Sequence, residues 1–79
     1  MDMTMEPNPI VYYDGTQSWY VDNHLHRLDG PARIYADGYQ AWWICGQNIT
    51  PQVEAWMSAQ GLTWPWDADT QIQFLLTFT

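Results

Sequence analysis

Two histidines and the acids around them are residue types from which a metal site could be built. His24 and His26 are two positions apart, so on an extended strand both side chains point to the same face. Asp22 or Asp29 could complete the ligand set. In the alternative, His26 and Arg27 brace the turn at Asp29 through hydrogen bonds or an ion pair. We favour this second role and predict no bound metal.

Carboxylates also recur in pairs that could serve as the acid and the base of a glycosidase. Asp67 and Asp69 are close in sequence, and an internal repeat could bring Asp14 and Asp37 together. Most of these residues lie in turn sequences, where a carboxylate accepts hydrogen bonds from nearby backbone. The serines lack a nucleophile motif, and we expect Cys45 to be a small buried apolar residue. We therefore predict no catalytic residues, no cofactor and no enzymatic activity.

The net charge indicates which class of partner the protein can bind. Nine acidic residues stand against two arginines and no lysine, which gives a net charge of −7. Binding DNA, RNA or anionic lipid requires clustered Lys and Arg, so these partners are excluded. The charge favours a basic protein surface as partner, while acidity that serves only solubility is the alternative.

Aromatic residues are abundant for a chain of this length. Six Trp, five Tyr and two Phe occur among 79 residues, which form one small domain, residues 1–79. They either fill the core or lie partly on the surface as contact residues. A single cysteine excludes an internal disulfide, and the first nine residues lack the features of an export signal. We therefore predict a cytoplasmic protein.

Residues 11–21 and 34–44 are two copies of one unit, offset by 23 positions. A fixed self-similarity of this kind indicates a supersecondary unit repeated in space. In each copy, β-branched and aromatic residues flank an Asp-Gly pair, which predicts a tight hairpin. The identical pairs are Tyr12/Tyr35, Asp14/Asp37, Gly15/Gly38, Gln17/Gln40 and Trp19/Trp42.

The predicted fold class is α+β, mainly β, with an antiparallel sheet of two repeated hairpins. We expect Tyr20 and Trp43 to point away from the face that the C-terminal segment covers, because side chains alternate along a strand. Pro51 and Gly61 are typical of a helix start and stop, which predicts a helix over residues 50–60 with Thr50 as its N-cap. The predicted strands are residues 10–13, 17–22, 32–36 and 40–45, within a duplicated region that spans 10–48.

The last segment alternates between apolar and polar residues, with Ile72, Phe74, Leu76 and Phe78 on one face. This pattern predicts a C-terminal strand over residues 70–78. A helix beginning at Asp67 is the competing interpretation, because several of the apolar residues also fit helical spacing.

The most distinctive motif joins the two copies and reads His26-Arg27-Leu28-Asp29-Gly30-Pro31-Ala32. Together with the Asp-Gly and Trp pairs around it, this motif resembles the "HR-x-DGPA" small proteins of bacteriophages and prophages, which are similar to variants of the MORN β-hairpin repeat. The resemblance covers residues 10–48, about half of the chain. We expect the turn residues His26, Arg27, Asp29, Gly30 and Pro31 to be structural.

In its small size, its acidity and this motif, the chain also resembles the phage-encoded inhibitors of host defence, including anti-CRISPR proteins. The resemblance implies a monomer or homodimer that acts in the cytoplasm of a bacterial host. It further implies that the protein binds the basic DNA channel of a type I CRISPR surveillance complex, for example one of type I-C. Such binding stops DNA from entering the channel. A structural or accessory phage module without inhibitory activity is the alternative. The candidate partner-binding residues are Asp14, Tyr20, Asp22, Asp29, Tyr35, Asp37 and Trp43.

Overall fold

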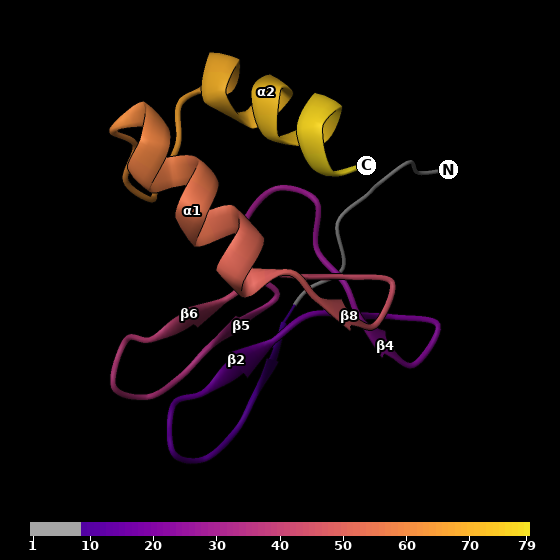
Figure 1. Ribbon diagram of the computed structural model, residues 1–79. Helices are drawn as coiled ribbons and strands as arrows, with labels where there is room; N and C mark the ends of the chain where they lie inside the picture. The colour runs from indigo at the N-terminus through magenta and orange to yellow at the C-terminus, as the bar shows by residue number, and fades with distance from the viewer. Residues whose placement is uncertain (1–8) are drawn as a thin grey trace.

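A computed structural model describes residues 9–79 and confirms the α+β class (Figure 1). Eight short strands precede two helices in this part of the chain. The strands are β1 (Ile10–Val11), β2 (Gln17–Ser18), β3 (Tyr20–Val21), β4 (His24–Leu25), β5 (Arg33–Ile34), β6 (Gln40–Ala41), β7 (Trp43–Ile44) and β8 (Gln47–Asn48). The helices are α1 (Thr50–Gln60) and α2 (Ala68–Phe78).

Each copy of the repeat contains two hairpins instead of the predicted one. The first hairpins are β1–β2 and β5–β6, and the second are β3–β4 and β7–β8. The predicted continuous strands over residues 17–22 and 40–45 are therefore wrong, because the chain leaves the main sheet at Trp19 and Trp42. Both of these side chains are buried. The Trp19 N–H donates to the Ala32 carbonyl, whereas the Trp19 carbonyl accepts the His26 N–H, so the backbone changes its hydrogen-bond partner at this residue.

The first hairpins of the two copies join into one sheet. Its strand order is β1-β2-β5-β6, and β2 pairs with β5 in an antiparallel register that places Gln17 opposite Ile34. The loops at residues 12–16 and 35–39, which we call the two tips, consequently lie at the same end of the sheet. Figure 1 shows both loops projecting away from the helices.

The second hairpins close with two-residue turns in which both central residues have positive φ. The values are 53° and 67° at Asp22 and Asn23, and 50° and 82° at Cys45 and Gly46. Such turns match the right-handed twist of the flanking strands. The two hairpins are joined to each other, because the Gly46 N–H donates to the Leu25 carbonyl at 2.9 Å. Cys45, expected to be buried, is exposed because it lies in a turn.

Helix α1 agrees closely with its predicted range and ends at Gly61, whose φ of 68° terminates the helix in the left-handed region. Its start differs in one respect. Ile49 is the N-cap, and Thr50 is the first helical residue with no side-chain bond to the helix. The Thr50 hydroxyl instead accepts the Trp42 N–H at 2.9 Å, and it thereby ties α1 to the repeat.

The C-terminal segment is helix α2, so the predicted strand over residues 70–78 is wrong. The Asp67 carboxylate accepts the Thr70 N–H at 2.8 Å and caps the helix N-terminus. Phe74 and Phe78 are four positions apart and lie on one side of the helix, with ring centroids 5.2 Å apart. The Gln71 amide also donates to the Leu28 carbonyl, which fixes α2 to the loop between the two copies.

The core lies between the second copy of the repeat and the two helices. Trp42, Val53 and Phe74 are fully buried at its centre. Trp66 stacks on Trp42 with ring centroids 5.9 Å apart, and several other rings pack edge to face around them. The partly buried residues around this centre are Ile44, Ile49, Trp56, Met57, Trp64, Trp66, Leu75 and Phe78.

Candidate interaction surface

Arg27 is bound within the fold. Its Nε donates to Asp29 Oδ1 at 2.6 Å and its Nη1 donates to the Pro31 carbonyl at 3.1 Å. The guanidinium also lies 3.9 Å from the ring centroid of Trp19. A Cβ added at Gly30 would lie 2.9 Å from the Arg27 Cζ, so only glycine leaves room for this arrangement. The motif between the two copies is therefore a structural joint built around one arginine.

Arg33 is also held by internal partners. Its Nε donates to the Ser18 hydroxyl at 2.8 Å, and its Nη2 donates to the Tyr20 hydroxyl at 3.0 Å. The Tyr20 hydroxyl lies 3.3 Å from that of Tyr12, and this hydrogen bond lowers the pKa of Tyr12, with Arg33 acting in the same direction. Since the sequence has no lysine, both strongly basic side chains of the chain serve the fold.

Most acidic residues of the described chain, in contrast to the two arginines, are exposed to solvent. Asp29 pairs with Arg27 and is half-buried, whereas six other acids are exposed. They occur in the first hairpins, in the turn between β3 and β4, and at both helices, so negative charge is spread over the surface. The six are Asp14, Asp22, Asp37, Glu54, Asp67 and Asp69.

The two tips repeat one local structure. Asp14 Oδ1 accepts the Thr16 N–H at 2.9 Å, and Asp37 Oδ1 accepts the Tyr39 N–H at 3.0 Å. Both carboxylates therefore close the same turn at equivalent positions of the repeat. The Thr16 N–H also holds the pKa of the Asp14 carboxyl below its usual value, so this group is ionised at neutral pH.

Four of the five tyrosines are exposed on the tips, while the tryptophans and phenylalanines are buried or half-buried. Tyr13 is fully exposed, and Tyr39 is 53% exposed. Tyr12 and Tyr35 line an open groove of about 350 Å³ that also contacts Asp14 and Arg33. The aromatic excess is thus divided by type, with Tyr at the tips and Trp and Phe towards the interior.

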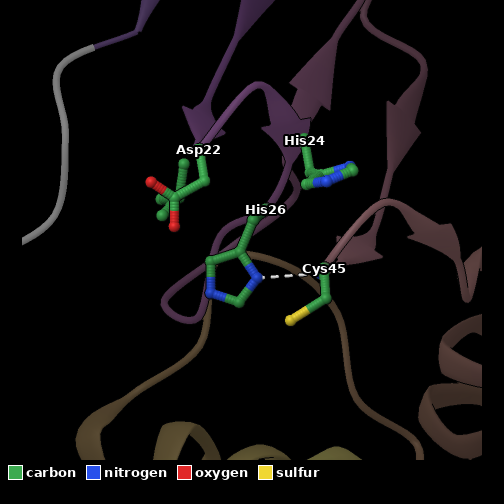
Figure 2. A pocket seen from close by; sticks show the side chains of 5 residues that line it. Asp22, His24, His26 and Cys45 are labelled. Atoms are coloured by element: carbon green, nitrogen blue, oxygen red, sulfur yellow. Dashed lines mark hydrogen bonds between the residues drawn. The ribbon is translucent and has the colours of Figure 1, made fainter.

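A second, smaller pocket of about 120 Å³ lies at the other end of the repeat (Figure 2). His24, His26 and Cys45 line it together with Asp22 and Val21. The His26 Nδ1 accepts the Cys45 backbone N–H at 2.9 Å, which leaves its Nε2 to carry the proton. His24 packs against Gly46, where an added Cβ would lie 3.0 Å from the His24 Nδ1. Both histidines thus contact the turn between β7 and β8.

Among residues 9–79, no group of three or more His, Cys, Asp or Glu side chains is arranged to hold a metal ion. Neither helix of this region is long and apolar enough to cross a membrane.

The predicted partner-binding residues fall into two groups. Asp14, Tyr35 and Asp37 lie together at the tips, and Asp22 is exposed in the turn between β3 and β4, at the second pocket. The other three are engaged within the fold. Tyr20 binds Arg33, Asp29 pairs with Arg27, and Trp43 is half-buried with its carbonyl accepting the Arg27 N–H.

Sequence reasoning missed the exposed tyrosines Tyr12, Tyr13 and Tyr39. A signal was present, because all three flank an Asp-Gly turn, where the chain reverses and side chains project outward. Strand alternation instead predicts outward-facing side chains at Tyr20 and Trp43, in the strands that follow each tip.

No family model, no curated protein and no solved structure matches this chain. The resemblances drawn from the motif and from the overall character of the sequence therefore stay predictions.

Proposed function

We propose that this protein inhibits a bacterial defence system by binding a basic protein surface. The observation that supports this proposal is that basic and acidic side chains are placed differently in the fold. Both arginines are bound within the fold, whereas six carboxylates are exposed on residues 9–79. Such a surface attracts cationic protein and repels phosphate.

The target we propose is the DNA-binding channel of a type I CRISPR surveillance complex, in the cytoplasm of a bacterial host. A channel that admits DNA is lined with Lys and Arg, because each phosphate contact needs a cation. An acidic protein seated at its entrance would block DNA by occupying the same side chains. No turnover is required for this action.

An order-of-addition experiment tests the proposal. A purified type I-C complex is incubated with the protein before or after its target DNA, and DNA binding is followed by gel shift. We expect inhibition when the protein is added first and little effect on the preformed DNA complex, because the channel is then occupied. Unchanged DNA binding in both orders, with no co-elution of protein and complex, would contradict the proposal.

A second candidate function is that of an accessory module that associates with itself. Ile72 and Leu76 on α2 are 53% and 77% exposed, and apolar side chains of this kind favour association. Light scattering separates the two functions. A stable oligomer, lost in Leu76→Asp and accompanied by no host partner, would support the accessory role.

A further inference from the structure

We infer that the two tips form one docking surface, and that the partner presents arginine rather than lysine side chains to it. The inference rests on the proposed function in one respect, namely that the partner is a basic protein. It adds the location of the contact and the chemistry that recognises it.

The sheet places the two tip carboxylates near each other. Because β2 and β5 are neighbours in the sheet, Asp14 and Asp37 are carried by adjacent hairpins. An added Cβ at Gly15 would lie 3.9 Å from the Ala36 side chain, so the two tips touch. Equivalent positions on hairpins two strands apart are separated by about 10 Å. The surface therefore presents two like charges at a spacing set by the sheet.

Both tip carboxylates are also preorganised. In each tip Oδ1 is held by a backbone N–H, which fixes the side chain. The Thr16 side chain also hydrogen-bonds to the Asp14 carboxylate and lowers its pKa further. A partner can thus pair with carboxylates whose side chains are already ordered, so binding costs less conformational entropy.

The exposed tyrosine rings of the two tips favour arginine over lysine. Tyr12 and Tyr13 precede the first carboxylate in the chain, and Tyr35 and Tyr39 flank the second, with ring centroids 5.7 Å apart. The Arg33 guanidinium lies 5.8 Å from the Tyr35 ring centroid, so Tyr13 and Tyr39 are the rings most open to a partner. A planar guanidinium both stacks on a tyrosine ring and pairs with a carboxylate, whereas an ammonium is a compact, strongly hydrated charge. The fold itself uses this combination, since Arg27 binds Asp29 while it lies over Trp19.

The other exposed regions lack this combination. The turns of the second hairpins pack against each other through Gly46 and His24. The exposed face of α2 carries Ile72 and Leu76, which offer a cation neither charge nor an aromatic ring. Charge and exposed aromatic rings coincide only at the tips within the described chain.

Three double variants test the inference. Asp14→Asn with Asp37→Asn removes both charges but keeps the Oδ1 acceptors that close the turns. Tyr13→Ala with Tyr39→Ala removes two exposed rings. Glu54→Gln with Asp69→Asn is the matched control, because it removes the same number of exposed charges from the helices. Thermal unfolding followed by circular dichroism shows whether all three keep the fold.

The probes are two synthetic peptides of equal length and charge, one with arginine and one with lysine, measured by calorimetry. We expect the wild type to bind the arginine peptide about fivefold more tightly than the lysine peptide. The tyrosine variant should lose this preference, and the tip aspartate variant should bind both peptides about tenfold more weakly. The helix control should change by less than about twofold.

The inference is overturned if the tip variants bind like the wild type, or if the helix control loses as much affinity as the aspartate variant. A parallel assay with the surveillance complex keeps the two proposals separate. If the wild type blocks DNA binding and the tip variants block it equally well, the docking surface is wrong and the function stands. If the wild type shows the arginine preference but never affects the complex, the function alone is wrong.

Discussion

At the scale of single residues, the same type of side chain has different roles that depend on its neighbours. Asp29 compensates a half-buried arginine, whereas Asp14 and Asp37 are exposed and close the turns of the two tips. Arg27 combines an ion pair, a carbonyl hydrogen bond and a ring contact. It is therefore the residue of the motif on which we expect folding to depend most.

We expect Arg27→Ala to lower the free energy of unfolding by about 2 to 4 kcal/mol, because it leaves the Pro31 carbonyl without its donor and removes the cation over Trp19. Asp29→Asn should cost less than about 1 kcal/mol, since Asp29 is 45% exposed and its ion pair is screened by water. Urea denaturation measures both values. Equal losses in the two variants would show that the ion pair, and not the ring and carbonyl contacts, dominates.

At the scale of elements, α2 shows how capping and packing select a helix. Its apolar residues alternate well enough for a strand, but Asp67 caps a helix and Phe74 inserts fully into the core. Trp56 of α1 contacts both Phe74 and Phe78. Leu75 packs against the core with these two rings, whereas Ile72 and Leu76 are exposed, a division that fits helical spacing and not the alternation of a strand.

We expect Asp67→Ala to lower the Tm at neutral pH by about 5 °C, and Asp67→Asn to lower it much less, because asparagine also caps helices. The Thr70 N–H holds the pKa of Asp67 below its ordinary value of 3.8. The stabilisation is therefore complete above that value and is lost as the pH falls through the lowered pKa.

Thermal unfolding between about pH 7 and pH 2 measures this effect. The difference in Tm between the wild type and Asp67→Ala should shrink in acid, because a protonated carboxyl is a weaker acceptor. A difference that stays constant across this range would mean that the charge of Asp67 does not contribute to capping.

At the scale of the whole molecule, the net charge of −7 lowers the stability of the fold but raises the affinity for a cationic partner. The exposed carboxylates repel one another in the folded state and attract a cationic partner. Added salt screens both effects. Stability and affinity should therefore respond in opposite directions to the same change in the solution.

We expect added sodium chloride to raise the Tm by about 4 °C, which corresponds to about 1 kcal/mol for a domain of this size. As the salt concentration increases, binding to the arginine peptide should weaken steadily. Differential scanning fluorimetry and calorimetry measure the two trends. A Tm that falls with salt would show that attractive pairs, such as that of Arg27, outweigh the repulsion.

The sequence by itself determined the features that depend on neighbours along the chain. The Asp-Gly turns, the range of α1 and its stop at Gly61 follow from local conformational preference, and all three were predicted. The shortage of basic residues is likewise a property of composition. Among the candidate partner-binding residues, Asp14 and Asp37 can be recognised as turn residues from their Asp-Gly pairs alone.

Only the tertiary structure decided which side chains are buried. Strand alternation assigns faces without showing that the chain changes sheets at Trp19 and Trp42, nor that the rings around Trp42 hold α2 as a helix. The division of aromatic residues, with Tyr13 outside and Trp66 half-buried, arises in the same way. Burial depends on contacts between segments far apart in the chain, and the free energy of those contacts exceeds the local preferences that a sequence pattern records.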